Sequence, residues 1–254
     1  RNRYPAFLLQ SDDLGFFEEQ AGFLVPEAVM SAHVLAALTH GANLRGHEEV
    51  ISWDAGNDSV LVTTNKGSYR AKRLVITAGA WTGKVLADLP LALTVTRQTW
   101  GWFWPQLPEN FALGTFPCWF YEGDHGAGHY GFPMMPDNPG FKLALHQPGK
   151  VTEPSTVDRS YQIEDEQHLR SFLADHLPTA NGELLAIRTC LYANSPDSHF
   201  IVDRHPKHAN VTIACGFSGH GFKFASVMGE VLAELATKGE STLPTDFLGL
   251  SRFR

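Results

Sequence analysis

Residues 216–223 read GFSGHGFK, and they stand between the apolar run 211–215 and the helix-like run 225–236. The first run predicts a buried strand and the second a helix, so three glycines occupy a strand-to-helix turn. Glycine lets the backbone approach a bound group closely, and the helix N-terminus that follows offers free N–H groups to an anionic or electron-rich ligand. A tight β–α turn without any ligand is the alternative interpretation.

Outward from this turn, the chain separates into two kinds of sequence. Short strands at regular spacing, with Gly and Pro between them, predict an antiparallel sheet over residues 90–185, whereas both ends mix strands with helices. We therefore expect an α/β plus α+β fold of two interleaved domains. Helices are predicted at 25–38, 81–86, 164–176 and 225–236. Strands are predicted at 60–64, 68–70, 74–77, 93–104, 116–121, 129–132, 141–146, 188–192, 200–203 and 211–214.

Composition limits the class of protein. With 254 residues, 43% of them hydrophobic and 19% charged, the chain can bury a core. A net charge of −7 argues against a nucleic-acid surface, and short, interrupted apolar runs predict no membrane span. Three scattered cysteines favour neither a disulfide framework nor a zinc site, so we expect no metal and a cytoplasmic protein. The first residues lack Met and an apolar leader, which we interpret as a start in mid-protein.

Lys142 and His146 lie four residues apart on a predicted strand, where a period of two places both on one face together with Ala144. A cation and an imidazole facing one cavity could stabilise a reduced oxygen species or an anionic intermediate. The alternative is an edge strand with both groups in solvent. Tyr130, on the preceding strand, offers a phenol that could bind a ligand.

Cys190 has two interpretations. A free cysteine is commonly a small buried hydrophobe, whereas a reactive one requires a nearby cation, which Lys223 could provide if the fold brings the two together. Tyr192, two residues further on, would share its strand face. His220, between two glycines, is expected to be a structural hydrogen-bonding group in its turn.

Five motifs then occur in the order typical of one protein family: TAGAW at 77–81, YGFP at 130–133, KLALH at 142–146, CLYANSPD at 190–197 with FIVD at 200–203, and GFSGHGFKF at 216–224. In these motifs the chain resembles the monomeric sarcosine oxidase and N-methyltryptophan oxidase family of flavoproteins over nearly its whole length. The NSPD at 194–197 and the closing LSRF at 250–253 look especially like the N-methyltryptophan oxidase branch.

The resemblance implies a partial FAD-binding (glutathione-reductase-like) domain interleaved with an antiparallel-sheet substrate domain. Residues 1–20 and 90–185 would belong to the substrate domain, and residues 21–89 and 186–254 to the FAD domain. The family opens with a strand, a GxGxxG phosphate loop and an acidic residue for the ribose. This chain has no such fingerprint, so we expect the first third of a family member to lie outside it.

By resemblance, Cys190 would carry FAD covalently through a thioether, Lys142 would activate oxygen, and Lys223 would pair with the substrate carboxylate. Active-site roles are implied for Lys142, His146, Tyr130 and Tyr192, with Lys223, Tyr130 and His146 binding the substrate. Cofactor contacts are implied for Cys190, Gly219, His220, Gly221, Phe222, Lys223, Val50, Ala78, Gly79 and Trp81.

The expected activity is oxidation of a secondary N-methyl amino acid to an imine by FAD, followed by reduction of oxygen to hydrogen peroxide and release of formaldehyde and the amino acid. Its partners would be a small N-alkyl amino acid and molecular oxygen, and the protein would be a monomer. The alternatives are a fructosyl amino acid or pipecolate oxidase, a truncated non-catalytic fragment, and a thiol hydrolase using Cys190 and His146.

Overall fold

The computed structural model describes residues 3–123, 128–138, 140–147 and 149–253. The chain divides into two compact units, each assembled from two segments. Unit 1 comprises Arg1–Phe23 and Thr96–Leu191, and unit 2 comprises Leu24–Val95 and Tyr192–Arg254.

Unit 1 is built on an antiparallel sheet with the strand order β10-β5-β8-β7-β6, in which the pairs β5–β8, β8–β7 and β7–β6 are all antiparallel. This confirms the antiparallel sheet expected from the strand spacing. β8 is an inner strand, so the alternative of an edge strand at Lys142 is wrong. The strands are β5 Thr94–Trp104, β6 Trp119–Glu122, β7 Gly128–Phe132, β8 Phe141–Gln147 and β10 Glu183–Asn194, with β9 Lys150–Val151 paired to β5.

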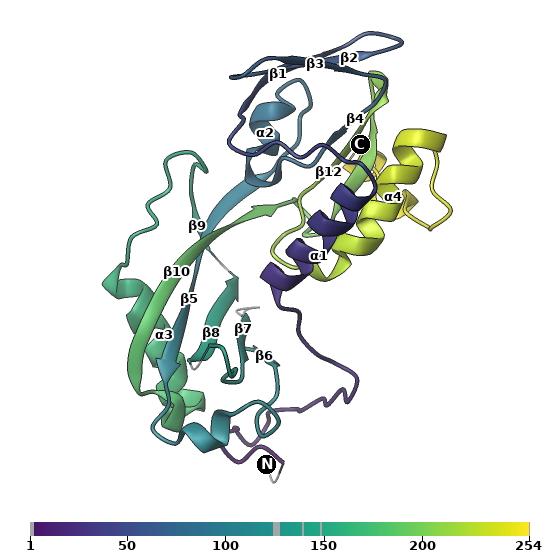
Figure 1. Ribbon diagram of the computed structural model, residues 1–254. Helices are drawn as coiled ribbons and strands as arrows, with labels where there is room; N and C mark the ends of the chain where they lie inside the picture. The colour runs from purple at the N-terminus through teal and green to yellow at the C-terminus, as the bar shows by residue number, and fades with distance from the viewer. Residues whose placement is uncertain (1–2, 124–127, 139, 148, 254) are drawn as a thin grey trace. The chain divides into compact units, whose positions relative to one another are not determined.

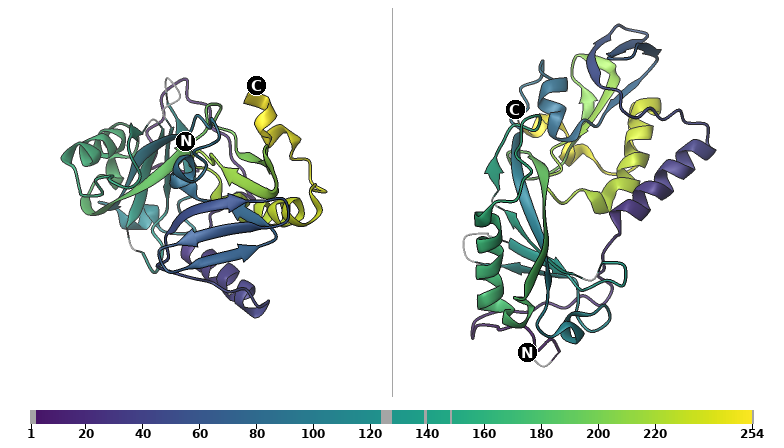
Figure 2. Two further views of the ribbon diagram at one scale, coloured as in Figure 1. Left: turned by 90° about the horizontal axis from the view of Figure 1, so that it is seen from above. Right: turned by 60° about the vertical axis from the view of Figure 1, so that its left-hand side comes forward.

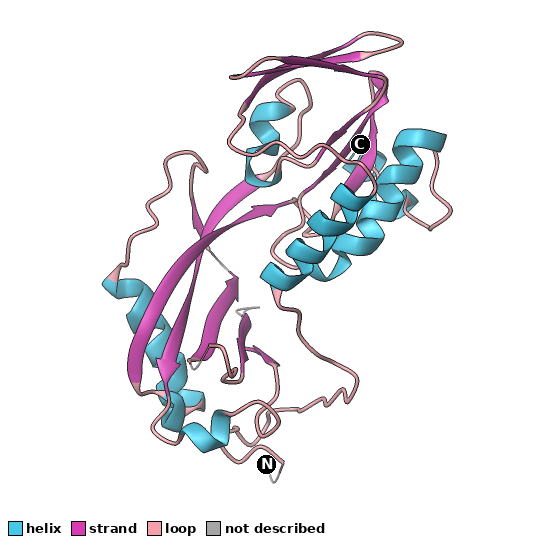
Figure 3. Ribbon diagram, viewed as in Figure 1, coloured by secondary structure: helices cyan, strands magenta, loops and turns pink. Residues whose placement is uncertain are grey.

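Helix α3 (Ile163–His176) packs on one face of this sheet and closes the core of unit 1 (Figures 1 and 3). Phe141 and Leu143 of β8 are fully buried there against Leu169 and Leu173 of the helix. Because side chains alternate along a strand, Lys142, Ala144 and His146 are directed to the opposite face. The alternation therefore separates the core face from a face that carries chemistry.

The start of α3 is fastened to the sheet by Arg97 of β5. Its guanidinium forms a bidentate pair with Asp165, at 2.7 and 2.9 Å, and both side chains are largely buried. Arg97 Nε also donates to the Asp158 carbonyl at 2.9 Å. A carboxylate in the first helical turn favours the positive end of the helix dipole, so the pair supports the helix as well as its docking.

Unit 2 contains a three-stranded sheet with the order β11-β12-β4, formed by β11 (Ile201–His205), β12 (His208–Cys215) and β4 (Leu74–Ile76). β11 and β12 form an antiparallel hairpin, and β12 runs parallel to β4. β12 is buried almost throughout, as expected for a strand covered on both faces. Helix α4 (Ala225–Lys238) buries Val231 and Leu232 against this sheet.

A second sheet in unit 2 joins β1 (Val50–Ala55), β2 (Val60–Thr64) and β3 (Ser68–Ala71) in antiparallel order (Figure 2). The sequence analysis did not predict β1, because this strand is mostly exposed and is defined by its pairing with β2 rather than by a buried face of its own.

Helix α1 (Pro26–Thr39) has no buried residue, although His33 Nε2 lies 3.1 Å from Ser226 Oγ at the start of α4. Three of the four predicted helices are confirmed to within two residues, and the fourth, at 81–86, is the short pair η1 (Gly79–Trp81) and α2 (Thr82–Val85). Within the described ranges, no helix combines the length and apolarity that a membrane crossing requires. The remaining helical turns are η2 Pro108–Phe111, η4 Pro178–Ala180, η5 Phe222–Phe224, η6 Asp246–Leu248 and η7 Leu250–Phe253.

Candidate functional site

The face of the unit 1 sheet opposite α3 surrounds Lys142 with aromatic rings. Lys142 pairs in register with Trp102 of β5 on one side and with Phe132 of β7 on the other. Its Nζ lies 5.1 Å from the Trp100 ring centroid, 5.4 Å from that of Trp102 and 5.3 Å from that of Phe132. Ring faces attract a cation, so the ammonium is held in place while its stem is half-buried.

Tyr130 and His146 lie on the same face, as their strand positions predict. Tyr130 pairs with Ala144, and its ring meets the His146 ring edge-on at a centroid distance of 6.2 Å. Both side chains are half-buried. Unit 1 therefore brings Lys142, Tyr130 and His146 together on one surface of the two neighbouring strands β7 and β8.

Cys190 of β10 is electrostatically coupled to Lys142. Burial raises the pKa of the Cys190 thiol to about 11, while the cations of Lys142 and Arg159 act in the opposite direction. Arg159 also donates to the carbonyl of Thr189, the neighbour of Cys190, at 3.2 Å. The thiol is therefore protonated at neutral pH, and further positive charge or a bound electrophile would be needed to make it reactive.

A buried hydrogen-bond donor accompanies this cluster. The indole Nε1 of Trp100 is inaccessible to solvent and has no hydrogen-bond partner among the described residues. Trp100 pairs with Ala144 across β5 and β8, so it lies on the same face as Lys142. A buried, unpaired N–H is costly, and an acceptor supplied by a bound molecule would satisfy it. Trp100 is not among the residues predicted from the sequence, because an indole on a strand ordinarily indicates packing.

In unit 2, two predicted cofactor turns leave the same edge of the parallel pair. Ile76 at the end of β4 stands in register with Ile213 near the end of β12. The 78–81 turn follows β4, and residues 216–221, here called the glycine loop, follow β12. Ligands of α/β sheets bind beyond the carboxyl ends of parallel strands, and both turns lie at that position.

The glycine loop needs its glycines for two reasons. Gly216 has a φ of 63° and Gly219 a φ of 80°, a region that favours glycine. A Cβ on Gly219 would overlap the ring of Tyr192, so the backbone lies flat against that ring. His220 Nε2 lies 3.0 Å from the Ser198 carbonyl, which agrees with a structural hydrogen bond in the turn. Lys223 is exposed at the end of the loop.

Val50 and Trp81, both predicted to contact the cofactor, line one cleft of about 360 Å³ in unit 2. Trp53 also lines it and donates from its indole to the Val85 carbonyl at 2.8 Å, which joins β1 to the end of α2. Gly79, with a φ of 55°, begins the turn that carries Trp81. The cleft residues are Glu49, Val50, Ile51, Ser52, Trp53, Trp81, Lys84 and Val85.

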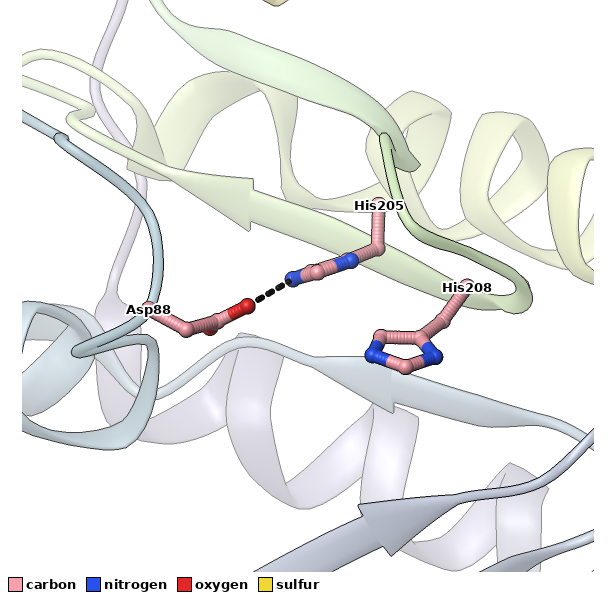
Figure 4. Close-up of side chains that lie close together, drawn as sticks. All are labelled: Asp88, His205 and His208. Carbon is pink, nitrogen blue, oxygen red and sulfur yellow. Dashed lines mark ion pairs between the residues drawn. The ribbon is translucent and has the colours of Figure 1, made fainter.

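A His and carboxylate cluster that the sequence analysis did not single out lies in unit 2, where ligand atoms of Asp88, His205 and His208 all lie within 4.8 Å of one another (Figure 4). His205 Nδ1 accepts a hydrogen bond from the Lys207 backbone N–H at 3.2 Å, so its proton is on Nε2, 3.3 Å from Asp88. Burial lowers the pKa of His205, and the Lys207 ammonium lies 3.5 Å from the same carboxylate oxygen. We interpret the cluster as an electrostatic link between the turn at Asp88 and the turn that joins β11 to β12. With its proton on Nε2, His205 offers no lone pair to a metal at that atom.

The letters of a GxGxxG pattern do occur in the chain, at residues 126–131. Gly128 and Gly131, however, lie within strand β7 and pair with β6 and β8. Residues 126 and 127 lie outside the described residues. A phosphate-binding loop must open a helix, so this stretch is not one.

Unit 2 has glycine turns at a parallel-strand edge and unit 1 has an antiparallel sheet, and both features are expected of a flavin-dependent oxidoreductase. The model of the FAD dependent oxidoreductase family, DAO, matches residues 1–235, and the chain belongs to this family. The family-level resemblance inferred from the five motifs is thereby confirmed.

Two curated relatives place the chain further. It is 38% identical to monomeric sarcosine oxidase of Streptomyces avermitilis over 253 residues, covering 96% of the chain and 64% of the relative. It is 32% identical to N-methyl-L-tryptophan oxidase of Escherichia coli O157:H7, covering 99% of the chain and 67% of the relative. Sequence identity is thus higher to the sarcosine oxidase than to the N-methyltryptophan oxidase. Overall identity therefore does not favour the N-methyltryptophan oxidase branch, which residues 194–197 and 250–253 resemble.

Among solved structures, L-proline dehydrogenase of P. horikoshii superposes with a TM-score of 0.77 at 26% identity, covering 90% of this chain and 59% of that one. The chain therefore spans about two thirds of the length of its sarcosine oxidase relatives, and less of this structural neighbour.

Proposed function

We propose that the chain provides the flavin-ring and substrate surfaces of an FAD-dependent oxidase of secondary N-methyl amino acids, of the sarcosine or N-methyltryptophan type. The observation that carries this proposal is the unit 1 surface on which Lys142, framed by three aromatic rings, is coupled to Cys190. Membership of the FAD family and the two curated relatives support it.

The residues present fit a flavin in two respects. The buried Trp100 Nε1 lacks an acceptor among the described residues, and a flavin ring carries carbonyl and nitrogen acceptors. The glycine loop and the 78–81 turn lie at the sheet edge where such groups bind. When bound, FAD would accept two electrons from the amine, giving the imine that water hydrolyses to formaldehyde and the primary amino acid, and would pass the electrons to oxygen to give hydrogen peroxide.

In this proposal each side chain has one task. Lys142 provides a fixed positive charge where oxygen acquires negative charge, and its aromatic frame limits its movement. Tyr130, His146 and Tyr192 bind and orient the amine, and Lys223 pairs with its carboxylate. Cys190 would hold the flavin through a thioether. Forming that C–S bond from the thiol and a C–H of the flavin ring system releases two electrons and two protons, which the flavin would accept and then pass to oxygen, giving hydrogen peroxide. The Lys142 cation favours formation of this bond, because it lowers the pKa of the Cys190 thiol, which burial raises.

The remaining predicted residues would contact the dinucleotide from unit 2. Val50 and Trp81 line the cleft beside β1, and Ala78 and Gly79 precede Trp81 in the turn after β4. We assign this group to the adenine and pyrophosphate side of FAD, and residues 219–222 to the pyrimidine edge of the flavin.

The covalent attachment is tested by incubating the chain with FAD and precipitating it with acid. A yellow pellet from the wild-type protein and a colourless one from Cys190→Ala support the thioether. Cys118→Ala, which removes another free, partly buried thiol, is the matched control and retains the colour. Covalent flavin in Cys190→Ala contradicts the assignment.

The substrate class is tested with a panel of N-methyl, glycated and cyclic amines, with peroxide release as the readout. Preference for sarcosine or N-methyltryptophan supports the proposal. Preference for glycated or cyclic amines identifies a fructosyl amino acid or pipecolate oxidase instead. Equilibrium dialysis with FAD tests binding directly, and no binding by the chain would contradict its proposed part in the cofactor site.

A further inference from the structure

The C-terminal segment of unit 2 is clamped to the loop between β10 and β11. Arg252 forms a bidentate pair with Asp197, Nε to Oδ2 at 2.8 Å and Nη2 to Oδ1 at 3.2 Å. The same guanidinium donates to the carbonyls of Leu248, Gly249 and His199 at 2.6, 3.1 and 3.1 Å. The planar guanidinium group has five N–H donors, so it can bind three backbone carbonyls and one carboxylate at once, whereas a lysine ammonium cannot.

Asp197 in turn organises residues 195–199, here called the 195–199 loop. Its Oδ1 accepts the His199 N–H at 3.1 Å and lies 3.1 Å from the Ser195 hydroxyl. Ser195 is 5% exposed and also reaches the His199 carbonyl at 2.6 Å. Ser198 adopts a φ of 61°, which a non-glycine residue keeps only when its surroundings hold it.

The 195–199 loop holds the glycine loop at two points. The Ser195 N–H donates to Ser218 Oγ at 3.2 Å, and that hydroxyl donates to the Gly216 carbonyl at 3.0 Å. His220 Nε2 lies 3.0 Å from the Ser198 carbonyl. Ser218 is only 1% exposed, so these bonds form out of contact with water, where a lost partner is costly.

The glycine loop needs such support because its backbone is strained. Gly216, Ser218 and Gly219 all have positive φ, at 63°, 50° and 80°. Glycine adopts this region freely, whereas in a serine the Cβ approaches the following carbonyl oxygen and disfavours it. Ser218 therefore keeps its conformation through its hydrogen bonds, which include one from its own N–H to the Ala193 carbonyl at 3.0 Å.

We propose that Arg252 is a positioning residue for the glycine loop, acting through Asp197 and the 195–199 loop. The C-terminal segment thereby sets the orientation of the backbone N–H groups of Gly219 and Gly221, whereas the His220 N–H donates within the loop to the Phe217 carbonyl at 3.0 Å. This inference rests on the proposed function, in which those groups meet the pyrimidine edge of the flavin. Arg252 makes no contact with the cofactor in this proposal, and its effect is transmitted through the hydrogen bonds described above.

Hydrogen exchange of the chain without FAD tests the clamp. In Arg252→Ala we expect the amides of residues 216–221 to exchange about tenfold faster, while helix α4 and the midpoint of global unfolding change little. Arg252→Lys keeps the charge but not the fork and restores only part of the protection. Asp197→Asn removes only the negative charge of this side chain, and we expect it too to speed amide exchange at residues 216–221. The matched control is Lys238→Ala, which removes a 2.8 Å ion pair of unit 2 outside the clamp and leaves the loop unchanged.

Unchanged exchange at 216–221 in both Arg252→Ala and Asp197→Asn overturns the inference. FAD titration provides the second readout: we expect at least about fivefold weaker binding and an altered visible flavin spectrum for Arg252→Ala, with no change for Lys238→Ala. Unaltered FAD binding and spectrum in Arg252→Ala would also overturn it. Absence of FAD binding by the wild-type chain counts against the proposed function instead, and the exchange experiment still decides whether Arg252 orders the loop.

Discussion

At the scale of single residues, the Lys142 cation favours loss of the Cys190 proton, against the larger opposing effect of burial. Burial raises the thiol pKa to about 11, and the Lys142 ammonium opposes this. In Lys142→Met the pKa is therefore expected to rise further, so that alkylation of Cys190 by iodoacetamide at pH 9 becomes severalfold slower. Peptide-level mass spectrometry separates Cys190 from the other cysteines.

The control for this prediction is Lys150→Met, an exposed lysine of the same unit that does not affect the Cys190 pKa. Equal alkylation rates in the wild type and Lys142→Met would show that the cation is not coupled to the thiol.

Gly219 and Gly83 differ in what a methyl group would meet. At Gly219 the positive φ and the overlap with the Tyr192 ring both oppose a side chain, so Gly219→Ala is expected to destabilise the protein by about 3 kcal/mol. Gly83 lies in helix α2 with open space around it, and Gly83→Ala is expected to stabilise by about 0.5 kcal/mol. Urea unfolding measures both, and equal effects would contradict the assignment of the close approach.

Sequence reasoning succeeded where a residue's role follows from its neighbours in the chain. Because side chains alternate along a strand, the sequence predicted that Lys142 and His146 lie on one face. The register of β8 with β5 and β7 agrees with this prediction. It could not find Trp100 or Arg159, because their importance depends on which strand or loop lies beside them. Their roles follow from packing rather than from local sequence.

At the scale of elements, we expect the packing of α3 on the sheet to weaken as the pH falls, because of His129. His129 of β7 stacks on Phe172 and His168 of the helix, with centroids 4.1 and 5.3 Å apart, and is 9% exposed. Burial, and then the nearby His168 and His176, lower the pKa of His129 from 6.5 to about 4. The folded state therefore excludes a proton that the unfolded chain accepts.

Between pH 6.5 and 4 the unfolded chain binds more protons at this site, so the free energy of unfolding is expected to fall as the pH falls, by up to about 3 kcal/mol. Denaturant unfolding across this range measures the slope. His129→Phe, which retains an aromatic ring in the stack, should flatten it. The exposed His40→Gln serves as the control, and an equal slope in His129→Phe would refute this origin.

Elements with a buried face or a distinct turn were predicted well, and elements defined by partners were not. β12 and α3 follow from their hydrophobic patterns. β1 was missed because it exposes most of its residues. β10 starts at Glu183, before the predicted 188, and residues 184–187 are all apolar, so the prediction began this strand too late within its apolar run.

At the scale of the whole chain, each unit has its own core. Leu173 is fully buried in unit 1 and Leu86 in unit 2, and they belong to different clusters of buried residues. Replacing either with Ala is expected to destabilise by about 3 kcal/mol through cavity formation. We expect Leu173→Ala to speed amide exchange chiefly in β5 and β8, and Leu86→Ala chiefly in β4 and β12. Equal effects of both variants on both sets of strands would indicate a single cooperative core.

By itself the sequence determined the family, through the resemblance of five motifs in order. It also determined the antiparallel middle region and the two glycine turns, because these depend on local periodicity and on residues with special backbone freedom. The tertiary structure decided which distant groups meet. Arg252 pairs with Asp197 across 55 positions, and Trp100 and Lys142 share a face through the β5–β8 register. Such contacts arise from packing and strand register, which the local pattern of one amino-acid sequence does not specify.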